Sequence, residues 1–426
     1  MKRHLAGVWW NRRLVGRLRE DERGLLHFSY DCDWLSGGGF PISVSLPLTL
    51  GEQESPAHSF FSGLLPEGGM RQRICRRQGV AEQDDVGLLL AIGGDCAGAL
   101  TVLPAGMEPE TELMMEPPQR LEPTTLAALI RGKGEGPTGG GSIPQRFSLA
   151  GAQEKLPVGM DGEGFWLPDG GHPSSHIIKF ETIKRVCFAE FMANRITAAL
   201  GLPVVETAYH LQQEQARAQP WLLISRYDRQ REAGGRLIRL HQEDMMQALG
   251  EPVSLKYQSD GGPSMAAIAE VIRRQVERPA LALALLRDWQ IVNFLLGNWD
   301  GHGKNLALLY RPGISTPTLA PFYDLVSIEF LNQITPGSYA REMAFFIGDE
   351  RKPERITRRH WEDFARALGM PPKPLLGRVL ELAEALPPIA RTCREAFAAE
   401  HGDSAIHHRL DKTLAKRCRA TLSPLG

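Results

Sequence analysis

The sequence predicts an α+β protein in which a strand-rich region is followed by a helical one. Its 426 residues, 42% of them hydrophobic, can bury more than one domain core. Short runs rich in β-branched and aromatic residues dominate up to Tyr227, for example His176 to Phe180. Beyond Tyr227 the apolar residues recur at helical spacing, as at Gln242 to Leu249 and Ala280 to Leu296. We therefore expect two lobes of different composition.

We divide the chain into four parts. Residues 1–104 alternate short strands with helical segments, which indicates a small α+β subdomain. Residues 105–144 form a connector that is too rich in proline, glutamate and glycine to bury much apolar area, apart from one short helix at 124–130. Residues 145–227 make a β-rich lobe and residues 228–426 a helical one. This order of lobes is that of a kinase-like fold.

Charge, cysteine content and hydropathy restrict the class of protein. The 49 basic and 50 acidic residues nearly cancel, so no large field draws the whole molecule to nucleic acid or anionic lipid. The six cysteines form no C-x-x-C pair and are expected to be reduced thiols. No apolar leader follows the N-terminus, and no run approaches the roughly 20 apolar residues of a membrane helix. We expect a cytoplasmic protein without membrane contact.

The polar segment NWDGHGKN, residues 298–305, is the most informative about chemistry. Asp300 and Asn305 have the spacing of the kinase catalytic loop, where an aspartate orients the acceptor hydroxyl and an asparagine binds Mg²⁺. Asp324 follows a strand candidate, where kinases place a second Mg²⁺ carboxylate. Because a D-x-x-x-x-N spacing also occurs by chance, the loop alone does not identify an active site.

Two upstream segments add to this pattern. Lys179 lies at the end of an apolar strand, like the kinase lysine that contacts the phosphates and pairs with a glutamate of the next helix, here Glu190. Strand-end lysines are usually solvated surface groups, so Lys179 gains weight only from its position before Asp300. In RFSLAGAQEK, residues 146–155, small residues would let backbone N–H groups approach phosphate oxygens.

Taken together, these motifs resemble the HipA family of bacterial toxin kinases over nearly the whole chain. FFSGLLPEGGMRQRI and DDVGLLLAIGGDCAGAL resemble its N-terminal subdomain, and FSLAGAQEK, HPSSHIIK, RLHQEDMMQALG, KYQSDGGP, NWDGHGKN and APFYD resemble its kinase core. The resemblance implies a two-lobed, protein-kinase-like fold with a β-rich N-lobe, an extra N-terminal α+β subdomain and an all-helical C-lobe.

The resemblance also implies an activity and partners. The chain would be a Mg²⁺- and ATP-dependent serine/threonine kinase that phosphorylates a cellular protein, typically an aminoacyl-tRNA synthetase. Translation would halt and the cell would become dormant, the state called persistence. A helix-turn-helix antitoxin of the HipB type would bind the kinase and carry it to operator DNA.

Residue roles follow from the same resemblance. Asp300 would be the catalytic base, Asn305 and Asp324 would hold Mg²⁺, and Lys179 would contact the ATP phosphates. Ser148 would be autophosphorylated, and ATP binding would then fail because a phosphoserine brings nearly two negative charges beside a phosphate loop. The other nucleotide-binding residues would be those of the phosphate loop, the adenine hinge and the rest of the nucleotide site: Ala150, Gly151, Ala152, Gln153, Glu154, Lys155, Ser225, Arg226, Tyr227, His302, Gly303, Lys304 and Tyr323.

Two alternatives stay open. A kinase of small molecules or lipids on the same fold would carry the same catalytic residues. A pseudokinase would act only as a binding module of a repressor complex, with the basic segment at residues 407–419 near DNA. The intact catalytic set argues against the second. For KYQSDGGP, no role beyond a turn at Gly261, Gly262 and Pro263 follows from the residues.

Overall fold

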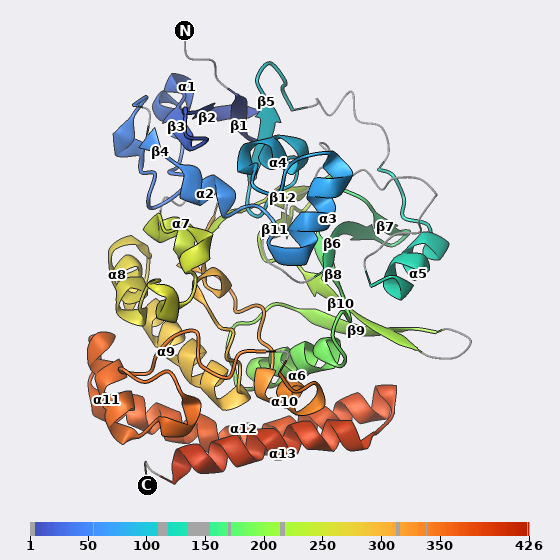
Figure 1. Ribbon diagram of the computed structural model, residues 1–426, viewed down its shortest axis with the longest axis vertical. Coiled ribbons are helices and arrows are strands. Elements are labelled where there is room, and N and C mark those ends of the chain that lie inside the picture. The colour runs from blue at the N-terminus through green and yellow to red at the C-terminus, as the bar shows by residue number, and fades with distance from the viewer. Residues whose placement is uncertain are drawn as a thin grey trace. The chain divides into compact units, whose positions relative to one another are not determined.

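The computed structural model contains two compact units, each built from three separate stretches of the chain (Figure 1). The first unit comprises residues 1–180, 212–253 and 307–317, and the second comprises residues 181–211, 254–306 and 318–426. The structure describes residues 5–53, 55–109, 118–133, 154–168, 172–213, 218–311, 316–337, 339–423 and 425. The four-part division stated above stays a prediction.

The first unit begins with an antiparallel sheet in the strand order β4-β3-β2-β1-β5. Alternate residues of β3 are buried, which places Leu26, Phe28 and Tyr30 on the face that carries the core. Helices that include α2 and α4 supply the rest of this core. The elements are β1 (Ala6–Trp10), β2 (Arg13–Glu20), β3 (Leu26–Tyr30), α1 (Cys32–Ser36), β4 (Ser55–Pro56), α2 (His58–Ser62), α3 (Gly68–Gln78), α4 (Asp85–Ile92) and β5 (Leu100–Pro104).

A second antiparallel sheet in this unit contains the consecutive strands β7-β6-β8-β10. The short helix expected at 124–130 is present as α5, and it packs against β10 through a core that includes Leu129 and Trp221. The elements are α5 (Pro123–Arg131), β6 (Lys155–Asp161), β7 (Gly164–Trp166), β8 (His176–Phe180) and β10 (Gln219–Ser225).

The stretch after Tyr227, expected to be helical, begins with strands instead. These are β11 (Arg229–Arg231), β12 (Leu237–Arg239) and β13 (His241–Asp244), and β13 pairs with β14 (Ala307–Tyr310). The predicted helix from Gln242 to Leu249 is therefore wrong in its first half. Asp244 is the N-cap of a shorter helix, α7 (Met245–Leu249), because its carboxylate accepts from the Gln247 N–H at 2.9 Å.

A buried ion network joins three distant segments of the first unit. Asp95, between α4 and β5, accepts from Ser174 Oγ at 2.6 Å and from Arg229 Nη2 at 2.9 Å. Arg226 makes two hydrogen bonds to Asp228, of 2.9 and 2.7 Å, and donates to Ser174 Oγ at 2.7 Å. All five residues are buried. The motifs GGDCAG, HPSS and SRYDR thus meet in one polar cluster.

Backbone carbonyls and a third guanidinium complete this network. Arg229 donates to the Gly98 carbonyl at 3.0 Å, and Arg226 donates to the Cys96 carbonyl at 3.1 Å. Arg239 lies 3.6 Å from Asp95. Burial alone would raise the pKa of Asp95, but the nearby guanidinium groups outweigh it and hold that pKa well below its ordinary value. Asp95 is therefore ionised and paired.

Another buried acid, Glu243 on β13, connects the N-terminal segment to β14. Ser43 Oγ and Tyr310 Oη each donate to this carboxylate at 2.5 Å, and the Val44 N–H donates at 3.0 Å. Burial nevertheless dominates and raises the pKa of Glu243 to about 7.

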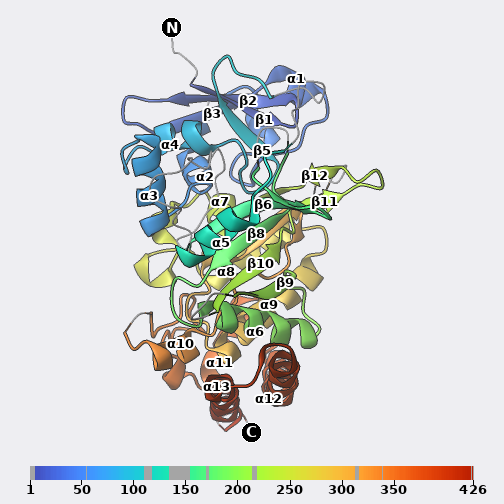
Figure 2. The same cartoon turned by 90° about the vertical axis from the view of Figure 1, so that its right-hand side faces the viewer.

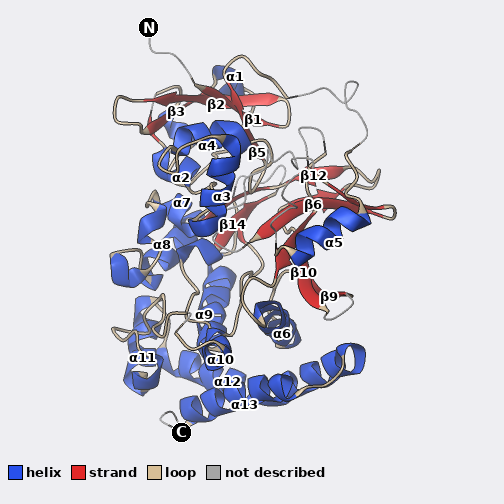
Figure 3. Cartoon of the chain, turned by 45° about the vertical axis from the view of Figure 1, so that its right-hand side comes forward, coloured by secondary structure: helices blue, strands red, loops and turns tan. Residues whose placement is uncertain are grey.

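The second unit is mostly helical (Figure 3). The long helices α12 and α13 pack side by side, and α12 also packs against α6, α9 and α11 (Figure 2). The helical spacing of apolar residues after Tyr227 also extends over 373–384, which form the start of α12, and this helix continues through Pro387 and Pro388. The elements are α6 (Val186–Ala199), β9 (Thr207–Gln212), α8 (Met265–Gln275), α9 (Pro279–Leu296), β15 (Thr318–Leu319), α10 (Ile328–Ile334), α11 (Arg358–Ala367), α12 (Pro372–His401) and α13 (Ala405–Leu422).

Helix α9 is the apolar centre of this unit. Leu286, Trp289 and Val292 are fully buried. In the described part of the chain this one helix is long and apolar enough to cross a membrane by length and composition, but 61% of its apolar window is buried inside the protein. Because core helices pass the same test, the result is weak support for a membrane span.

We expect Glu243 to make stability depend on pH. A folded-state pKa of about 7, above the ordinary 4.5, contributes stability that is present below pH 4.5 and is lost as pH rises through 7. Relative to Glu243→Gln, the wild type should lose up to about 3 kcal/mol over this range. Urea unfolding at a series of pH values measures the effect, and equal slopes for both proteins would contradict it.

Candidate active site

The loop after α9 is held to that helix by asparagine side chains. Gly297 ends the helix with φ 70°, a left-handed conformation that favours glycine. The Asn298 amide then donates to Asn293 Oδ1 at 2.7 Å, and Asn298 Oδ1 accepts from the Asp300 N–H at 3.3 Å. A Cβ at Gly301 would lie 3.2 Å from Asn293, so the chain passes close to the helix here. The backbone of Asp300 is therefore positioned by buried groups of α9.

Asp300 is exposed, and its carboxylate accepts a hydrogen bond from Tyr257. The Tyr257 hydroxyl lies 2.7 Å from Asp300 Oδ1. The Tyr257 ring also contacts His302 edge-on, with centroids 5.3 Å apart, and the Gly303 N–H donates to the Lys256 carbonyl at 3.3 Å. The segment KYQSDGGP thus packs on the loop and orients its aspartate. Sequence reasoning recognised this motif but missed its role.

Asn305 and Asp324 lie together in the second unit. Asn305 Nδ2 is 3.4 Å from Asp324 Oδ2, and Asn305 Oδ1 accepts from the His302 N–H at 3.0 Å. Asp324 has φ 55°, which is uncommon for a residue with a side chain and costs of order 1–3 kcal/mol. Strain of this kind persists where the surroundings impose it, and it is concentrated at functional sites.

The donor set at these two residues fits Mg²⁺. A carboxylate and an amide oxygen are hard ligands of the kind this cation prefers. After accepting from His302, Asn305 Oδ1 keeps a second lone pair for a cation.

His302 and Lys304 are buried within the loop. Burial, followed by the positive charges of Lys256 and Lys304, lowers the pKa of His302 to about 3. The imidazole is therefore neutral at physiological pH, and the positive charge of the loop comes from the lysines. Tyr323 fixes the backbone here by donating to the Lys304 carbonyl at 2.6 Å.

The remaining predicted site residues lie elsewhere in the chain. Lys179 is buried on β8 of the first unit, and Glu190 is buried on α6 of the second, so their pairing stays a prediction. The Arg226 guanidinium lies inside the buried ion network, and the Arg226 N–H donates to the Ser175 carbonyl at 3.0 Å, so its role at a nucleotide stays a prediction. Ser225 ends β10, Lys155 begins β6, Tyr227 donates to Gln242, and Glu154 pairs with Arg73. Ser148, Ala150, Gly151, Ala152 and Gln153 lie outside the described residues.

We expect the His302 ring to remain uncharged from pH 8 to about pH 5, because its pKa is about 3. NMR of the imidazole resonances, assigned by comparison with His302→Asn, should show no titration in this interval. A titration step near the ordinary histidine value of about 6.5 would contradict the described burial.

Two family models match the chain. The HipA N-terminal domain matches residues 6–103, and the HipA-like C-terminal domain matches residues 147–390. The putative kinase Y4mE of Sinorhizobium fredii is 35% identical over 98% of this chain and 99% of its own length. The serine/threonine-protein kinase toxin HipA of Shewanella oneidensis is 30% identical over 84% of this chain and 82% of its own length.

A solved structure is similar along the same length. A chain of the Shewanella oneidensis complex of HipA, HipB and operator DNA superposes with a TM-score of 0.83 at 26% identity, covering 99% of this chain and 98% of that one. The predicted α+β, kinase-like fold of the HipA type is thereby confirmed.

Proposed function

The chain belongs to the HipA family, and we propose that it is a serine/threonine-protein kinase toxin that transfers the γ-phosphoryl group of ATP to a cellular protein. The observation that carries the proposal is the arrangement of one loop. Asp300 is exposed, and its carboxylate accepts a hydrogen bond from Tyr257. On the same unit, Asn305 Nδ2 lies 3.4 Å from Asp324 Oδ2. Phosphoryl transfer requires little more than such positioning together with charge neutralisation.

In this proposal Asp300 accepts the proton of the acceptor hydroxyl. Its Oδ1 is held by the Tyr257 hydroxyl, so the other carboxylate oxygen can face the acceptor. Asn305 and Asp324 would hold Mg²⁺, which when bound neutralises charge on the β- and γ-phosphates. Lys179 and Lys304 would add positive charge at the phosphates. The backbone at Ala150 to Lys155 would form the phosphate loop, and that at Ser225 to Tyr227 the adenine hinge.

We further propose that Ser148 is the site of inhibitory autophosphorylation. A phosphoserine carries nearly two negative charges and three strong acceptor oxygens. In a loop that receives ATP phosphates, that charge opposes nucleotide binding.

The partners belong to the same proposal. The structural neighbour was solved with HipB and operator DNA, which supports an antitoxin of that type and DNA contact through the complex. An aminoacyl-tRNA synthetase is the proposed protein substrate, and its modification would stop translation and growth. The cysteines are all free thiols, which supports a reducing compartment such as the cytoplasm.

Intact mass after incubation with Mg²⁺ and ATP tests the activity. After phosphatase treatment, the wild type should gain one phosphoryl group, whereas Asp300→Asn should be slowed by about 10²-fold or more. Ser148→Ala should gain none but still phosphorylate an added synthetase. Asp349→Asn is the matched control, because Asp349 is an exposed aspartate whose side chain is 78% accessible.

The other outcomes point to different functions. Transfer to inositol lipids but to no protein would favour a lipid kinase. Absence of both self-modification and transfer would refute the kinase proposal and favour a binding module.

Tyr257→Phe should lower kcat by about tenfold with little change in the KM for ATP, because a hydrogen bond to a charged group is worth roughly 1.5–3 kcal/mol. In the Asp300→Asn background the same change should have no further effect, since the oriented carboxylate is already gone. Tyr209→Phe removes a hydroxyl from a tyrosine that packs against Phe397, and it is the control variant that should leave kcat unchanged. An unchanged kcat in Tyr257→Phe would show that the hydroxyl does not position Asp300.

A further inference from the structure

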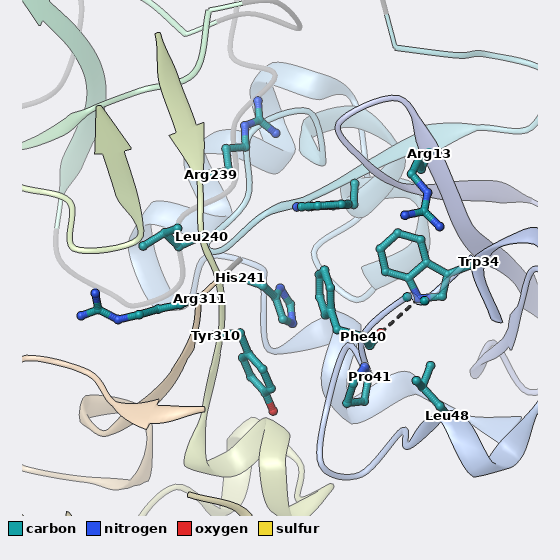
Figure 4. A pocket seen from close by; sticks show the side chains of 13 residues that line it. Arg13, Trp34, Phe40, Pro41, Leu48, Arg239, Leu240, His241, Tyr310 and Arg311 are labelled. Atoms are coloured by element: carbon teal, nitrogen blue, oxygen red, sulfur yellow. Dashed lines mark hydrogen bonds between the residues drawn. The ribbon is translucent and has the colours of Figure 1, made fainter. Parts of the chain in front are cut away.

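A cavity of about 300 Å³ lies within the first unit, and none of the residues proposed for catalysis lines it (Figure 4). Its lining comes from the N-terminal subdomain and from the ends of β12, β13 and β14. No aspartate or glutamate is among the described residues that line it. Aromatic rings and arginines dominate instead.

The aromatic wall is held in place by its own contacts. The Trp34 indole donates to the Phe40 carbonyl at 3.0 Å, and the two ring centroids are 5.1 Å apart. Phe40 also contacts His241 at 5.2 Å, so that its ring lies between Trp34 and His241 (Figure 4). A Cβ at Gly39 would lie 2.3 Å from the Trp34 indole nitrogen. Gly39 thus permits the close approach of the backbone to Trp34 that builds this wall.

The charge at the cavity is positive. Arg13 stacks over Trp34 with its guanidinium carbon 4.8 Å from the ring centroid and donates to the Gly37 carbonyl at 3.1 Å. Arg311 follows Tyr310 at the end of β14 and is exposed. Among the described residues, neither Arg13 nor Arg311 forms an ion pair. Figure 4 shows Arg13 beside Trp34, whereas the Arg311 side chain points away from the aromatic rings.

The third arginine extends this charge inward. Arg239 lines the cavity and belongs to the buried ion network, where three guanidinium groups face two carboxylates. One formal positive charge is therefore in excess. Burial lowers the pKa of His241 to about 4, so the arginines alone supply the charge at neutral pH.

We propose that this cavity binds a small aromatic anion, one flat ring system of indole or purine size that carries a carboxylate or a phosphate. The ring would stack on Phe40, the partly exposed member of the wall, which the buried Trp34 and Tyr310 hold in place. Aromatic faces and guanidinium planes both favour flat rings. The anionic group would meet Arg13, whose planar fork matches carboxylate and phosphate oxygens. A cavity of this volume is at the small end of ligand pockets, which excludes dinucleotides.

Calorimetric titration tests the proposal with two probes, indole-3-acetate and adenosine monophosphate. The full-length protein is first saturated with Mg²⁺ and a non-hydrolysable ATP analogue, so that the proposed catalytic site cannot take up the nucleotide. We expect at least one probe to bind when titrated to about 1 mM, and the uncharged indole or adenosine to bind about tenfold more weakly. Binding of the first probe alone identifies a carboxylate ligand, and binding of the second alone identifies a phosphate ligand.

Variants distinguish the contribution of the arginine charges to probe binding from that of the aromatic wall. Arg13→Gln combined with Arg311→Gln should weaken probe binding by about tenfold or more, whereas Arg359→Gln, on an exposed helix position, should not. Phe40→Leu should weaken it while the thermal midpoint reports whether the unit is still folded. Absence of binding by both probes, or equal binding by the double variant and the wild type, would overturn the proposal. The result does not depend on kinase activity, because no turnover is measured.

Discussion

The fold of the first unit depends on the burial of Asp95 and Asp228 among three guanidinium groups. Removing charged groups from water costs several kcal/mol per ion, and the cost is offset only when each group has its partners. These partners come from the loop between α4 and β5, from the segment before β8 and from the residues after β10. The buried charges of these three segments are paired only when the segments lie in this arrangement. The network therefore specifies how the N-terminal sheet joins the second sheet, whatever its net contribution to stability.

Helix positions could be predicted where the apolar residues recur at helical spacing over many residues and where a proline or a glycine marks the ends. The helix expected at 280–296 is α9, which begins one residue earlier and ends where expected, because Pro279 opens it and Gly297 closes it. At 242–249 the apolar spacing predicted a helix that begins too early. Asp244 is the N-cap of α7, and the residues before it belong to the buried strand β13. Helix α12 continues through Pro387 and Pro388, although a proline inside a helix removes a hydrogen bond, because the helix packs against its neighbours.

At the candidate site, the residues that could be named from the sequence are those whose spacing is local. Asp300 and Asn305 belong to one loop, and Asp324 follows it closely. Tyr257 could not be assigned in this way, because its hydrogen bond to Asp300 spans 43 residues and depends on how KYQSDGGP packs. The same limit applies to Arg226, which was expected at the nucleotide but has its side chain in the buried network.

The discontinuity of the first unit affects the order in which it can form. Glu243 is separated by 200 residues from Ser43 and by 67 from Tyr310, and its carboxylate accepts from both. At a synthesis rate of about 5–20 residues per second, Tyr310 emerges roughly 10–50 s after Ser43. During that interval the nascent chain holds Ser43 but lacks β14, which carries the Tyr310 hydroxyl and pairs with β13. This part of the core can close only when 310 of the 426 residues have been translated, so most of the chain is already synthesised when the first unit is completed.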